Sequence, residues 1–426
     1  MPVEHTDVLV IGAGQAGIAA SEHLSKAGIR HRVLERARIA ERWRSERWDS
    51  LVANGPAWHD RFPGLEFSGI AADAFVPKEQ VADYFVEYAS RIDAPIREGV
   101  TVTAVRRKPN SAGFVAQTSA GEVQARYVIC ATGAFQHPLV PAIVPTRDGL
   151  TQMHSTQYRN PQDLPEGNVL VVGAGSSGVQ IATEILQSGR RTLLSVGSHD
   201  RPPRRYRERD FCWWLGVLNL WDAEASEQSS HTTIAVSGAD GGYTIDFRDL
   251  AHQGMTLLGL TERHDDGVLH FADNLADNIR QGDANYLALL DLADAYVERN
   301  GLDLPEDPEA RVLGPDPTCM TEPLHSLDLR AEGITTIIWA TGFSVDYGWL
   351  QVDALDDDGR PRHKRGVSTE PGVYFLGLPW QSRRGSSFIW GVWHDASFVV
   401  DHIRKQEGYL TYQGRAERLG TPTKGQ

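Results

Sequence analysis

The sequence of 426 residues has little cysteine, no cluster of Lys and Arg dense enough to form a stripe that follows nucleic-acid phosphates, and no long apolar run. Its three cysteines, Cys130, Cys212 and Cys319, lie far apart, which excludes a disulfide scaffold, a CxxC redox pair and a cysteine-rich zinc site. Lys and Arg number 42 against 56 Asp and Glu, a net charge of −14, so nucleic acid and anionic membranes are poor partners. No stretch approaches the ~20 apolar residues that span a bilayer, and the polar N-terminus does not resemble a signal peptide. We therefore expect a cytoplasmic protein, without a transmembrane segment, that acts on small molecules.

The overall composition is that of an ordinary folded protein. Hydrophobic residues make up 41% of the chain and charged residues 23%, which is typical of globular domains. The length corresponds to two or three domains of roughly 150 residues.

A glycine motif near the N-terminus has the context of a dinucleotide-binding unit. Residues 7–12 read as a buried strand, 12–17 spell GAGQAG, a helical pattern ends at Gly28, and a second strand ends at Glu35. The first glycine permits a tight turn, the second lets the backbone approach a pyrophosphate, and the third lets the helix pack on the strand. Glu35, 23 residues after Gly12, is placed to bind a ribose. The expected contacts of this unit are Gly12, Gly14, Gln15, Ala16, Gly17, Glu35 and Arg36.

The same pattern recurs once, with a different ending. Residues 168–173 read as a strand that leads into GAGSSG at 173–178, a helix to Gln187 and a strand from Thr192 to Val196. The position that corresponds to Glu35 is Val196, and arginines follow it, which favours a 2′-phosphate and hence NADPH over NADH. A solvated charged loop is the alternative, and Asp200 weakens the first interpretation. The expected contacts are Gly173, Gly175, Ser176, Ser177, Gly178, Ser198, Arg201 and Arg204.

Several shorter motifs complete a family pattern. They are Trp43-Arg44, Trp48-Asp49-Ser50-Leu51, Asn54-Gly55-Pro56, Ala131-Thr132-Gly133 and Ala340-Thr341-Gly342. Together with the two glycine motifs they resemble the flavin-containing monooxygenases and their bacterial relatives across essentially the whole chain. The resemblance implies FAD on the first unit and NADPH on the second. It also implies cofactor contacts from Trp43, Arg44, Trp48, Ser50 and both Ala-Thr-Gly motifs, and a catalytic role for Asn54 over the flavin, although an asparagine before Gly-Pro is also a common turn former.

The resemblance implies an α/β fold with two Rossmann-like, three-layer ββα domains, the NADPH domain being inserted into the FAD domain. We expect the first part of the FAD domain at 1–160 and the NADPH domain at 161–330, with a substrate or access segment at about 200–300. The second part of the FAD domain is expected at 331–411 and a frayed tail at 412–426.

The linker signature of the family, Phe-x-Gly-x-x-x-His-x-x-x-aromatic, is half present. His154, Tyr158 and Arg159 fit, whereas Asp148 and Leu150 replace the Phe and the Gly. This departure argues against the Baeyer–Villiger branch, and His154 is equally explained as a hinge residue that bonds backbone between the domains.

The resemblance implies that reduced FAD and O₂ form a C4a-hydroperoxide that oxygenates a small organic substrate at a soft nitrogen or sulfur. Baeyer–Villiger oxygenation of a ketone, an NADPH oxidase or quinone reductase, and a non-catalytic redox sensor remain as alternatives. A disulfide reductase is disfavoured because no two cysteines are closely spaced.

The apolar segment 211–221, FCWWLGVLNLW, has three open interpretations. It is a wall of the substrate access path or a homodimer patch, part of the core, or a shallow membrane contact.

Overall fold

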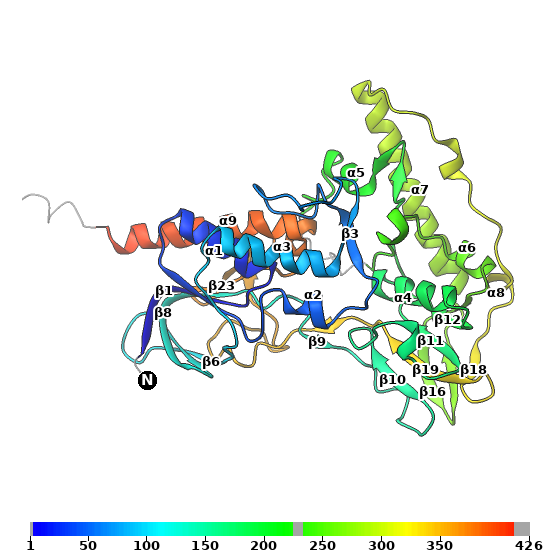
Figure 1. The fold of residues 1–426 in the computed structure, drawn as a ribbon, viewed down its shortest axis with the longest axis horizontal. Helices are drawn as coiled ribbons and strands as arrows, with labels where there is room; N and C mark the ends of the chain where they lie inside the picture. The colour runs from blue at the N-terminus through cyan, green and yellow to red at the C-terminus, as the bar shows by residue number, and fades with distance from the viewer. Residues whose placement is uncertain (1–2, 225–232, 413–426) are drawn as a thin grey trace, which may run out of the picture.

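The computed structural model describes residues 3–224 and 233–412, which form two lobes side by side (Figure 1). The tail expected to fray lies outside these residues apart from Tyr412. Each lobe is built on a sheet with parallel strands. The α/β class and the parallel sheets are therefore confirmed.

The first lobe contains a nine-stranded sheet with β1 (Glu4–Ile11) at its centre. β1 pairs in parallel with β2 (His31–Leu34) and β8 (Gly121–Cys130), and the parallel ladder extends to β5 (Ile96–Arg97) and β23 (Val373–Phe375). The apolar residues of β1 are buried because both faces of this strand are covered. The antiparallel strands of this sheet are β6 (Val102–Arg107), β7 (Phe114–Thr118), β21 (His363–Lys364) and β22 (Val367–Ser368).

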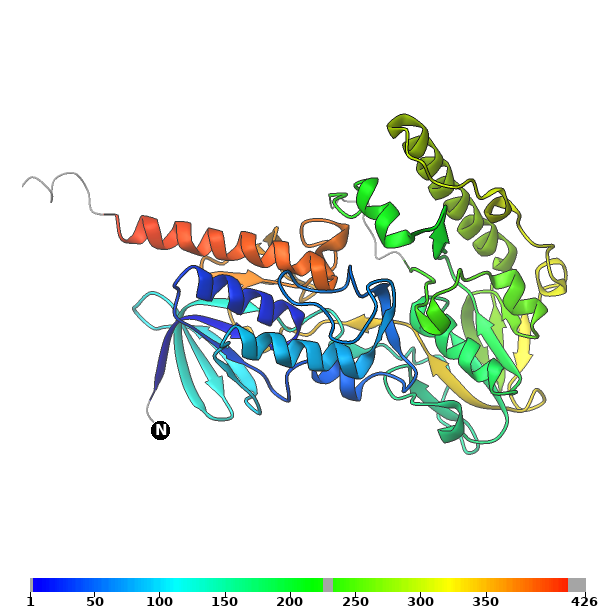
Figure 2. The same cartoon turned by 45° about the horizontal axis from the view of Figure 1, so that its top comes forward.

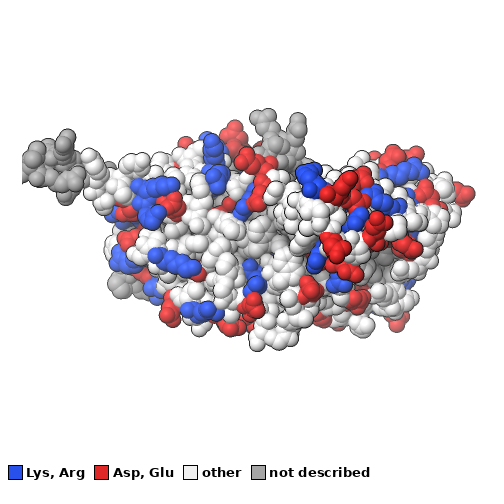
Figure 3. Space-filling model, turned by 90° about the horizontal axis from the view of Figure 1, so that it is seen from above, with Lys and Arg blue, Asp and Glu red and all other residues white. Residues whose placement is uncertain are grey.

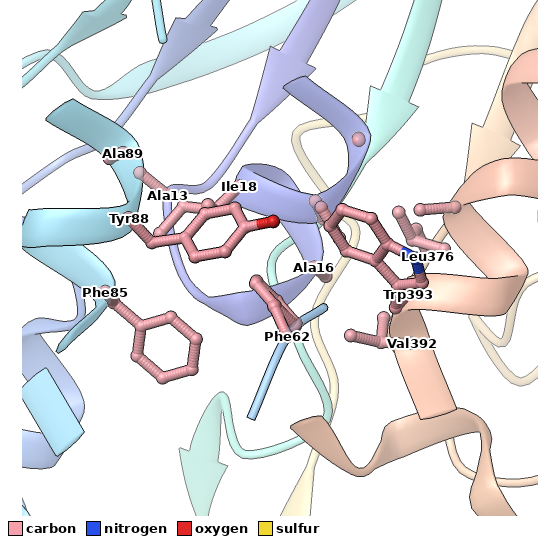
Figure 4. Close-up of a cluster of buried hydrophobic side chains, with 14 of the residues drawn as sticks. Ala13, Ala16, Ile18, Phe62, Phe85, Tyr88, Ala89, Leu376, Val392 and Trp393 are labelled. Carbon is pink, nitrogen blue, oxygen red and sulfur yellow. The ribbon is translucent and has the colours of Figure 1, made fainter. Parts of the chain in front are cut away.

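Three helices cover one face of this sheet: α1 (Gln15–Lys26), α3 (Lys78–Arg91) and α9 (Ile389–Leu410) (Figures 1 and 2). Their apolar faces meet in a core in which Phe62 lies between Tyr88 of α3 and Trp393 of α9 (Figure 4). The ring centroids are 5.0 and 5.2 Å from that of Phe62. Trp393 also meets the ring of His23 on α1, with centroids 4.5 Å apart, so this packing joins all three helices.

The second lobe contains a five-stranded parallel sheet in the order β10 (Thr151–His154), β19 (Ile334–Trp339), β11 (Asn168–Val172), β12 (Thr192–Ser195), β15 (Thr256–Leu258). One core joins a face of it to α4 (Ser176–Gln187), α6 (Phe247–His252) and α7 (Leu275–Asn300). Another core joins the opposite face to β17 (Val268–Phe271) and β18 (Ser326–Asp328), and β17 also pairs in antiparallel with β16 (Thr261–Asp265).

The domain boundaries expected from the sequence are displaced at both ends. β19 pairs with β10 on one side and with β11 on the other, so residues 151–154 and 334–339 belong to the second sheet. The expected boundaries at 160 and 331 assigned them to the FAD domain. Parallel pairing continues from β11 to β19 and from β19 to β10, which places both strands in the second sheet. The chain returns to the first sheet at Leu350, which bridges to Val105 of β6, and then adds β21–β23.

Short elements lie between and around the two sheets. The segment 211–221 contains α5 (Phe211–Val217), whose Phe211, Trp214 and Leu215 are buried, as is Trp221, so about half of the segment is core. Charges of both signs are interspersed on the face shown in Figure 3, in keeping with a chain that has no basic stripe. The remaining elements used below are α2 (Glu41–Ser45), β3 (Val52–Pro56), β4 (Phe75–Pro77), β9 (His137–Pro138), β13 (Arg205–Tyr206), β14 (Arg209–Asp210), α8 (Thr318–Thr321) and β20 (Phe343–Ser344).

Candidate functional site

The first glycine loop connects β1 to α1 and leaves room for a ligand at its second glycine. Gly12 has φ +105°, and a Cβ there would lie 2.5 Å from the carbonyl oxygen of Ala131. A Cβ at Gly17 would collide with the carbonyl group of Gly12, so the first turn of α1 packs directly on the loop. At Gly14, in contrast, nothing lies within 4 Å of a Cβ position. The open space in front of the N-terminus of α1 fits the pyrophosphate of a dinucleotide.

Glu35 follows β2 and holds the same loop. Its two carboxylate oxygens accept the backbone N–H groups of Ala13 at 2.8 Å and Ala37 at 2.9 Å. The side chain is half-buried, so it remains reachable by a ribose, while Arg36 is exposed. The structure thus gives Glu35 a loop-holding role that the sequence did not indicate, beside the predicted ligand role.

Gln15 and Ala16 connect the first loop to the start of α9. The side-chain amide of Gln15 donates to the carbonyl oxygen of Ser387 at 2.8 Å. The methyl group of Ala16 lies 3.0 Å from a Cβ position at Gly377, so only glycine fits there comfortably. Segments that lie far apart in the sequence therefore close around one end of β1.

The aromatic and arginine motif after α1 is divided between packing and ion pairing. Trp48 is buried in the core of the second lobe, and Trp43 contacts the cores of both lobes. Arg44 forms an ion pair with Asp83 at 2.8 Å, and Ser50 is exposed. The predicted cofactor contacts of Trp43, Arg44, Trp48 and Ser50 remain predictions, and the structure accounts for Trp48 by packing alone.

The two Ala-Thr-Gly motifs end β8 and β19 at equivalent places. The Ala131 N–H donates to Ile11 at 2.9 Å and the Ala340 N–H to Val172 at 2.8 Å, so each alanine extends a strand beside its glycine loop. Thr132 and Thr341 use their hydroxyl groups within the protein, the first accepting from Gln136 at 2.9 Å and the second donating to Leu139 at 2.5 Å. The glycines that follow, Gly133 and Gly342, have φ of +74° and +83°.

The second glycine loop repeats the backbone of the first but is more covered. A Cβ at Gly173 would lie 2.5 Å from the Ala340 carbonyl oxygen, and one at Gly178 would collide with the carbonyl of Gly173. At Gly175 the same position lies 3.1 Å from Cγ2 of Thr233. Ser176 donates its hydroxyl to the carbonyl oxygen of Ile234 at 2.7 Å. Segment 233–234 therefore lies against the start of α4, where Ser177 stays exposed.

The arginines predicted to bind a 2′-phosphate are buried in the second lobe. Arg201 is 2% exposed and donates to Asp283, at 2.8 Å from Nε and 2.5 Å from Nη2. Arg204 is 1% exposed and donates to Asp210 at 2.6 Å. Both guanidinium groups already have carboxylate partners, so the prediction that Arg201 and Arg204 meet the phosphate conflicts with this structure. A sequence does not show which arginines of a dense run turn inward.

Two other members of the run are exposed. Arg205 and Arg209 are exposed, and within residues 3–224 and 233–412 neither has an ion-pair partner. Ser198 is exposed just after β12. Their exposure makes Arg205, Arg209 and Ser198 candidates for a phosphate contact.

Asn54 lies on β3 between the two lobes. Its side-chain oxygen accepts from Nε2 of Gln180 on α4 at 2.9 Å, and its carbonyl oxygen accepts from Arg204 at 2.6 Å. Gln180 also donates to the carbonyl oxygen of Val236 at 2.6 Å. The structure thus brings the predicted catalytic residue into contact with the helix of the second glycine loop. Gln180 carries no signal in the sequence, because nothing marks which residues of α4 face β3.

His154 has the hinge geometry that was one of its two interpretations. Its Nε2 lies 3.0 Å from the carbonyl oxygen of Gly342, and its Nδ1 lies 3.1 Å from the hydroxyl of Thr156. Burial lowers the pKa of the ring. A neutral, fully hydrogen-bonded imidazole beside the connection at β20 is suited to holding the lobes together.

The cysteines do not form a redox pair. All three are free, and Cys130 and Cys212 are buried. Burial raises the pKa of both thiols, which keeps them protonated. Among the described residues no group of three or more His, Cys, Asp or Glu side chains could hold a metal ion, and no helix is long and apolar enough to cross a membrane.

Comparison with known proteins places this geometry in a family. Residues 9–215 match the family described as pyridine nucleotide-disulphide oxidoreductase. A protein of Geobacillus kaustophilus described as an uncharacterized CzcO-like oxidoreductase is 32% identical over 402 residues, with 93% of this chain and 98% of the relative covered.

Solved structures share the fold. The flavin-containing monooxygenase from Stenotrophomonas maltophilia superposes with a TM-score of 0.65 at 18% identity, covering 95% of this chain and 99% of that one. The bacillithiol disulfide reductase from Bacillus cereus gives a TM-score of 0.60 at 16% identity, covering 95% and 100%.

These findings confirm the resemblance to flavin-containing monooxygenases at the level of the fold, and they confirm an oxidoreductase. FAD and NADPH, the predicted cofactors, agree with a pyridine nucleotide family and a flavin enzyme fold. The chain belongs to the family of CzcO-like oxidoreductases.

Proposed function

We propose that this chain is an FAD-dependent, NADPH-using monooxygenase that inserts one oxygen atom from O₂ into a small organic substrate at a soft nitrogen or sulfur. The observation that carries the proposal is the position of Asn54. Asn54 lies on β3, between the two sheets. Its side chain contacts Gln180 of α4, the helix that starts at the second glycine loop. An amide at that junction can serve both cofactors.

When bound, FAD supplies hydride acceptance and oxygen activation. The chain itself supplies two dinucleotide cradles, at Gly14 and at Gly175, and a carboxylate at Glu35 for a ribose. It also supplies the Asn54 amide between the two lobes, where a preorganised group stabilises developing charge better than water does. Few acid–base groups are needed for such a reaction, in keeping with the neutral, hydrogen-bonded His154 at the hinge.

The alternative functions would use the same two nucleotide-binding loops and differ in the reaction that follows. A dithiol-dependent disulfide reductase requires two neighbouring thiols, and the three cysteines of this chain are free and lie far apart in the sequence. An NADPH oxidase or quinone reductase shares both cradles and releases H₂O₂ or reduced quinone without oxygenating a substrate. A redox sensor requires no turnover.

The experiment is to reduce the purified, FAD-loaded protein with NADPH, mix it with oxygen in a stopped-flow instrument and follow O₂ uptake and H₂O₂ release. We expect H₂O₂ release to lag well behind O₂ uptake without a substrate. A soft amine or sulfide substrate should replace H₂O₂ with the oxygenated product. Simultaneous O₂ uptake and stoichiometric H₂O₂ release under both conditions would identify an oxidase instead.

A further inference from the structure

An open cavity of about 850 Å³ lies between the edge of the first sheet and helix α9. One wall is made by residues 361–369, which contain the hairpin of β21 and β22. The other wall is made by Phe398 and His402, one turn apart on α9. β21 is the last strand on its side of the sheet, and no lining residue belongs to either glycine loop. This cavity is therefore distinct from both predicted nucleotide sites.

The lining is basic, although the chain as a whole has a net charge of −14. Among the described residues it includes Arg362, Lys364 and Arg365 and no Asp or Glu. Arg362 donates to the carboxylate of Asp353. Lys364 and Arg365 are exposed, and neither has an ion-pair partner within residues 3–224 and 233–412. Two positive charges are thus left without a counter-charge at one wall.

The acidic residues next to the lining in the chain or on α9 have other partners. Asp401 pairs with two basic residues of its own helix, at 2.7 Å each. Glu370, which follows the hairpin, pairs with Arg107 at 2.5 Å. Asp395 is 3% exposed, and its carboxylate accepts the Ser382 hydroxyl at 2.5 Å. None of these carboxylates forms an ion pair with the two unpaired cations of the wall.

The two histidines of the lining add hydrogen-bonding groups and no charge. Burial lowers the pKa of His363 and of His402, so both rings are neutral near pH 7. Nδ1 of His363 accepts the Gly366 N–H at 3.2 Å, which leaves the proton of the neutral ring on Nε2. The unpaired positive charge of the cavity therefore comes from Lys364 and Arg365.

Arg365 stands at a backbone position that does not favour arginine. It forms the two-residue turn between β21 and β22 with Gly366, and the two residues have φ of +52° and +84°. Such a turn favours Asn or Gly at its first position, because a larger side chain is strained there. The Arg365 guanidinium lies 4.0 Å from the ring centroid of Phe398, and it donates to no other described residue. A guanidinium over a ring face keeps its in-plane N–H groups for a ligand.

Apolar side chains lie beside these charges. Pro361, Val367 and Phe398 belong to the lining, so a ligand with an organic group can bury apolar surface here. Two unpaired cations match the charge of a phosphate monoester, which is close to −2 at neutral pH. The fork of a guanidinium also matches the geometry of phosphate oxygens. These features together favour an organic phosphate over a neutral compound or an inorganic ion.

We propose that the cavity between the β21–β22 hairpin and α9 binds an organic phosphate, with Lys364 and Arg365 holding the phosphate and the apolar lining residues holding the organic group. The proposal goes beyond the proposed function and does not depend on it, because the cavity shares no residue with the two glycine loops.

The test titrates phenyl phosphate into the oxidised, FAD-loaded protein by calorimetry at low ionic strength. Saturating NADP⁺ is present, so that a phosphate site for the nucleotide is already filled. We expect one phenyl phosphate per chain. Inorganic phosphate should bind roughly 5- to 10-fold more weakly, because it buries no apolar surface. Phenol, which has the ring without the charge, should also bind more weakly than phenyl phosphate.

Three variants locate the site. Arg365→Asn removes the charge and introduces a residue that the turn favours, so the hairpin should persist. Lys364→Gln removes the other charge without changing the turn. Each should weaken phenyl phosphate binding roughly 3- to 10-fold, the range for one exposed charged hydrogen bond. Arg360→Gln is the matched control, because it removes an exposed cation of the same segment that does not line the cavity. It should weaken binding less than about 2-fold.

Several results would overturn the proposal. They are wild-type protein that does not bind phenyl phosphate, phenol or inorganic phosphate that binds as tightly as phenyl phosphate, and losses in Arg365→Asn and Lys364→Gln no larger than the loss in Arg360→Gln. No turnover is involved in any of these measurements. Binding that follows the expected pattern in a protein that never oxygenates a substrate would contradict the proposed function alone.

Discussion

The two glycine loops of this protein share one backbone shape and differ in what surrounds it. Gly12 and Gly173 have φ of +105° and +111°, and each faces the carbonyl oxygen of an alanine at the same distance, 2.5 Å from a Cβ position. At the second glycine the loops diverge, since Gly14 faces open space and Gly175 faces Thr233.

The strands that follow the two loops diverge as well. β2 is followed by Glu35, whose carboxylate holds the first loop. At the matching place β12 ends at Ser195, which donates to the carbonyl oxygen of Gly259 at 2.8 Å, followed by buried Val196. The glycines therefore set the turn, and the residues after the second strand of each unit set which nucleotide it can accept.

The largest effects should come from filling each loop in turn. Gly14→Val places a side chain in the space of the pyrophosphate, with no protein atom within 4 Å of its Cβ, so we expect folded but colourless protein. Gly175→Val should keep the flavin and lose its reduction by NADPH. Flavin absorbance and anaerobic reduction measure the two results, and flavin retained in Gly14→Val, or lost in Gly175→Val, would break the comparison.

Substitution of Asn54, which lies between the two loops, should change the reaction with oxygen and leave the binding of both cofactors intact. Asn54→Leu removes the amide that meets Gln180, and we expect FAD binding and reduction to persist. The lag between O₂ uptake and H₂O₂ release should shorten by at most ~10²–10³-fold, the scale for one preorganised donor. Gln180→Leu is the matched control, because it removes the same hydrogen bond from the other side. Loss of flavin in Asn54→Leu would indicate a turn former, and an unchanged lag would remove Asn54 from the chemistry.

Buried and exposed arginines after β12 should separate stability from cofactor choice. Arg201→Met breaks a buried ion pair and should lower the free energy of unfolding by about 3 kcal/mol. Arg205→Glu should change stability by less than about 0.5 kcal/mol and raise KM for NADPH more than KM for NADH. Urea unfolding and steady-state kinetics provide the measurements. Equal effects of Arg205→Glu on both cofactors would move the phosphate site elsewhere.

The smallest expected effect is a pH dependence carried by buried histidines in both lobes. Burial lowers the pKa of His31 in the first lobe and of His199 in the second. The unfolded chain takes up protons near pH 6.5 while these folded rings stay neutral, so stability should fall as pH drops through ~6.5 toward the lower folded pKa. His199→Phe should reduce that slope by at most about 1.4 kcal/mol per pH unit. Chemical unfolding at several pH values tests this, and an unchanged slope would contradict the neutral state of His199.

Local pattern predicted a large part of this fold. The strand, glycine turn and helix of each unit lie close to the expected positions, with α1 at Gln15–Lys26 and α4 at Ser176–Gln187. These features depend on residues near in sequence, where glycine spacing and apolar period are decisive. β10 and β19 belong to the second sheet because they pair with strands that are far away in the sequence. A local sequence pattern does not indicate such pairing.

The site shows the same division. The open space at Gly14 follows from the motif itself, whereas the burial of Arg201 depends on Asp283, 82 residues later. His59 and Asp60 are neighbours in the sequence, whereas Trp221 and Trp390, which contact the His59 ring, lie more than 150 residues away. The sequence does not predict the role of a side chain whose partners lie far away along the chain.

The central claim is that the first loop holds FAD and the second holds the nicotinamide cofactor that reduces it. Anaerobic titration of the purified protein with NADPH, and separately with NADH, tests this most directly. We predict one non-covalent FAD per chain, bleached by about one equivalent of NADPH and at higher concentrations by NADH. Protein without flavin, or flavin that neither nucleotide reduces, would contradict the account.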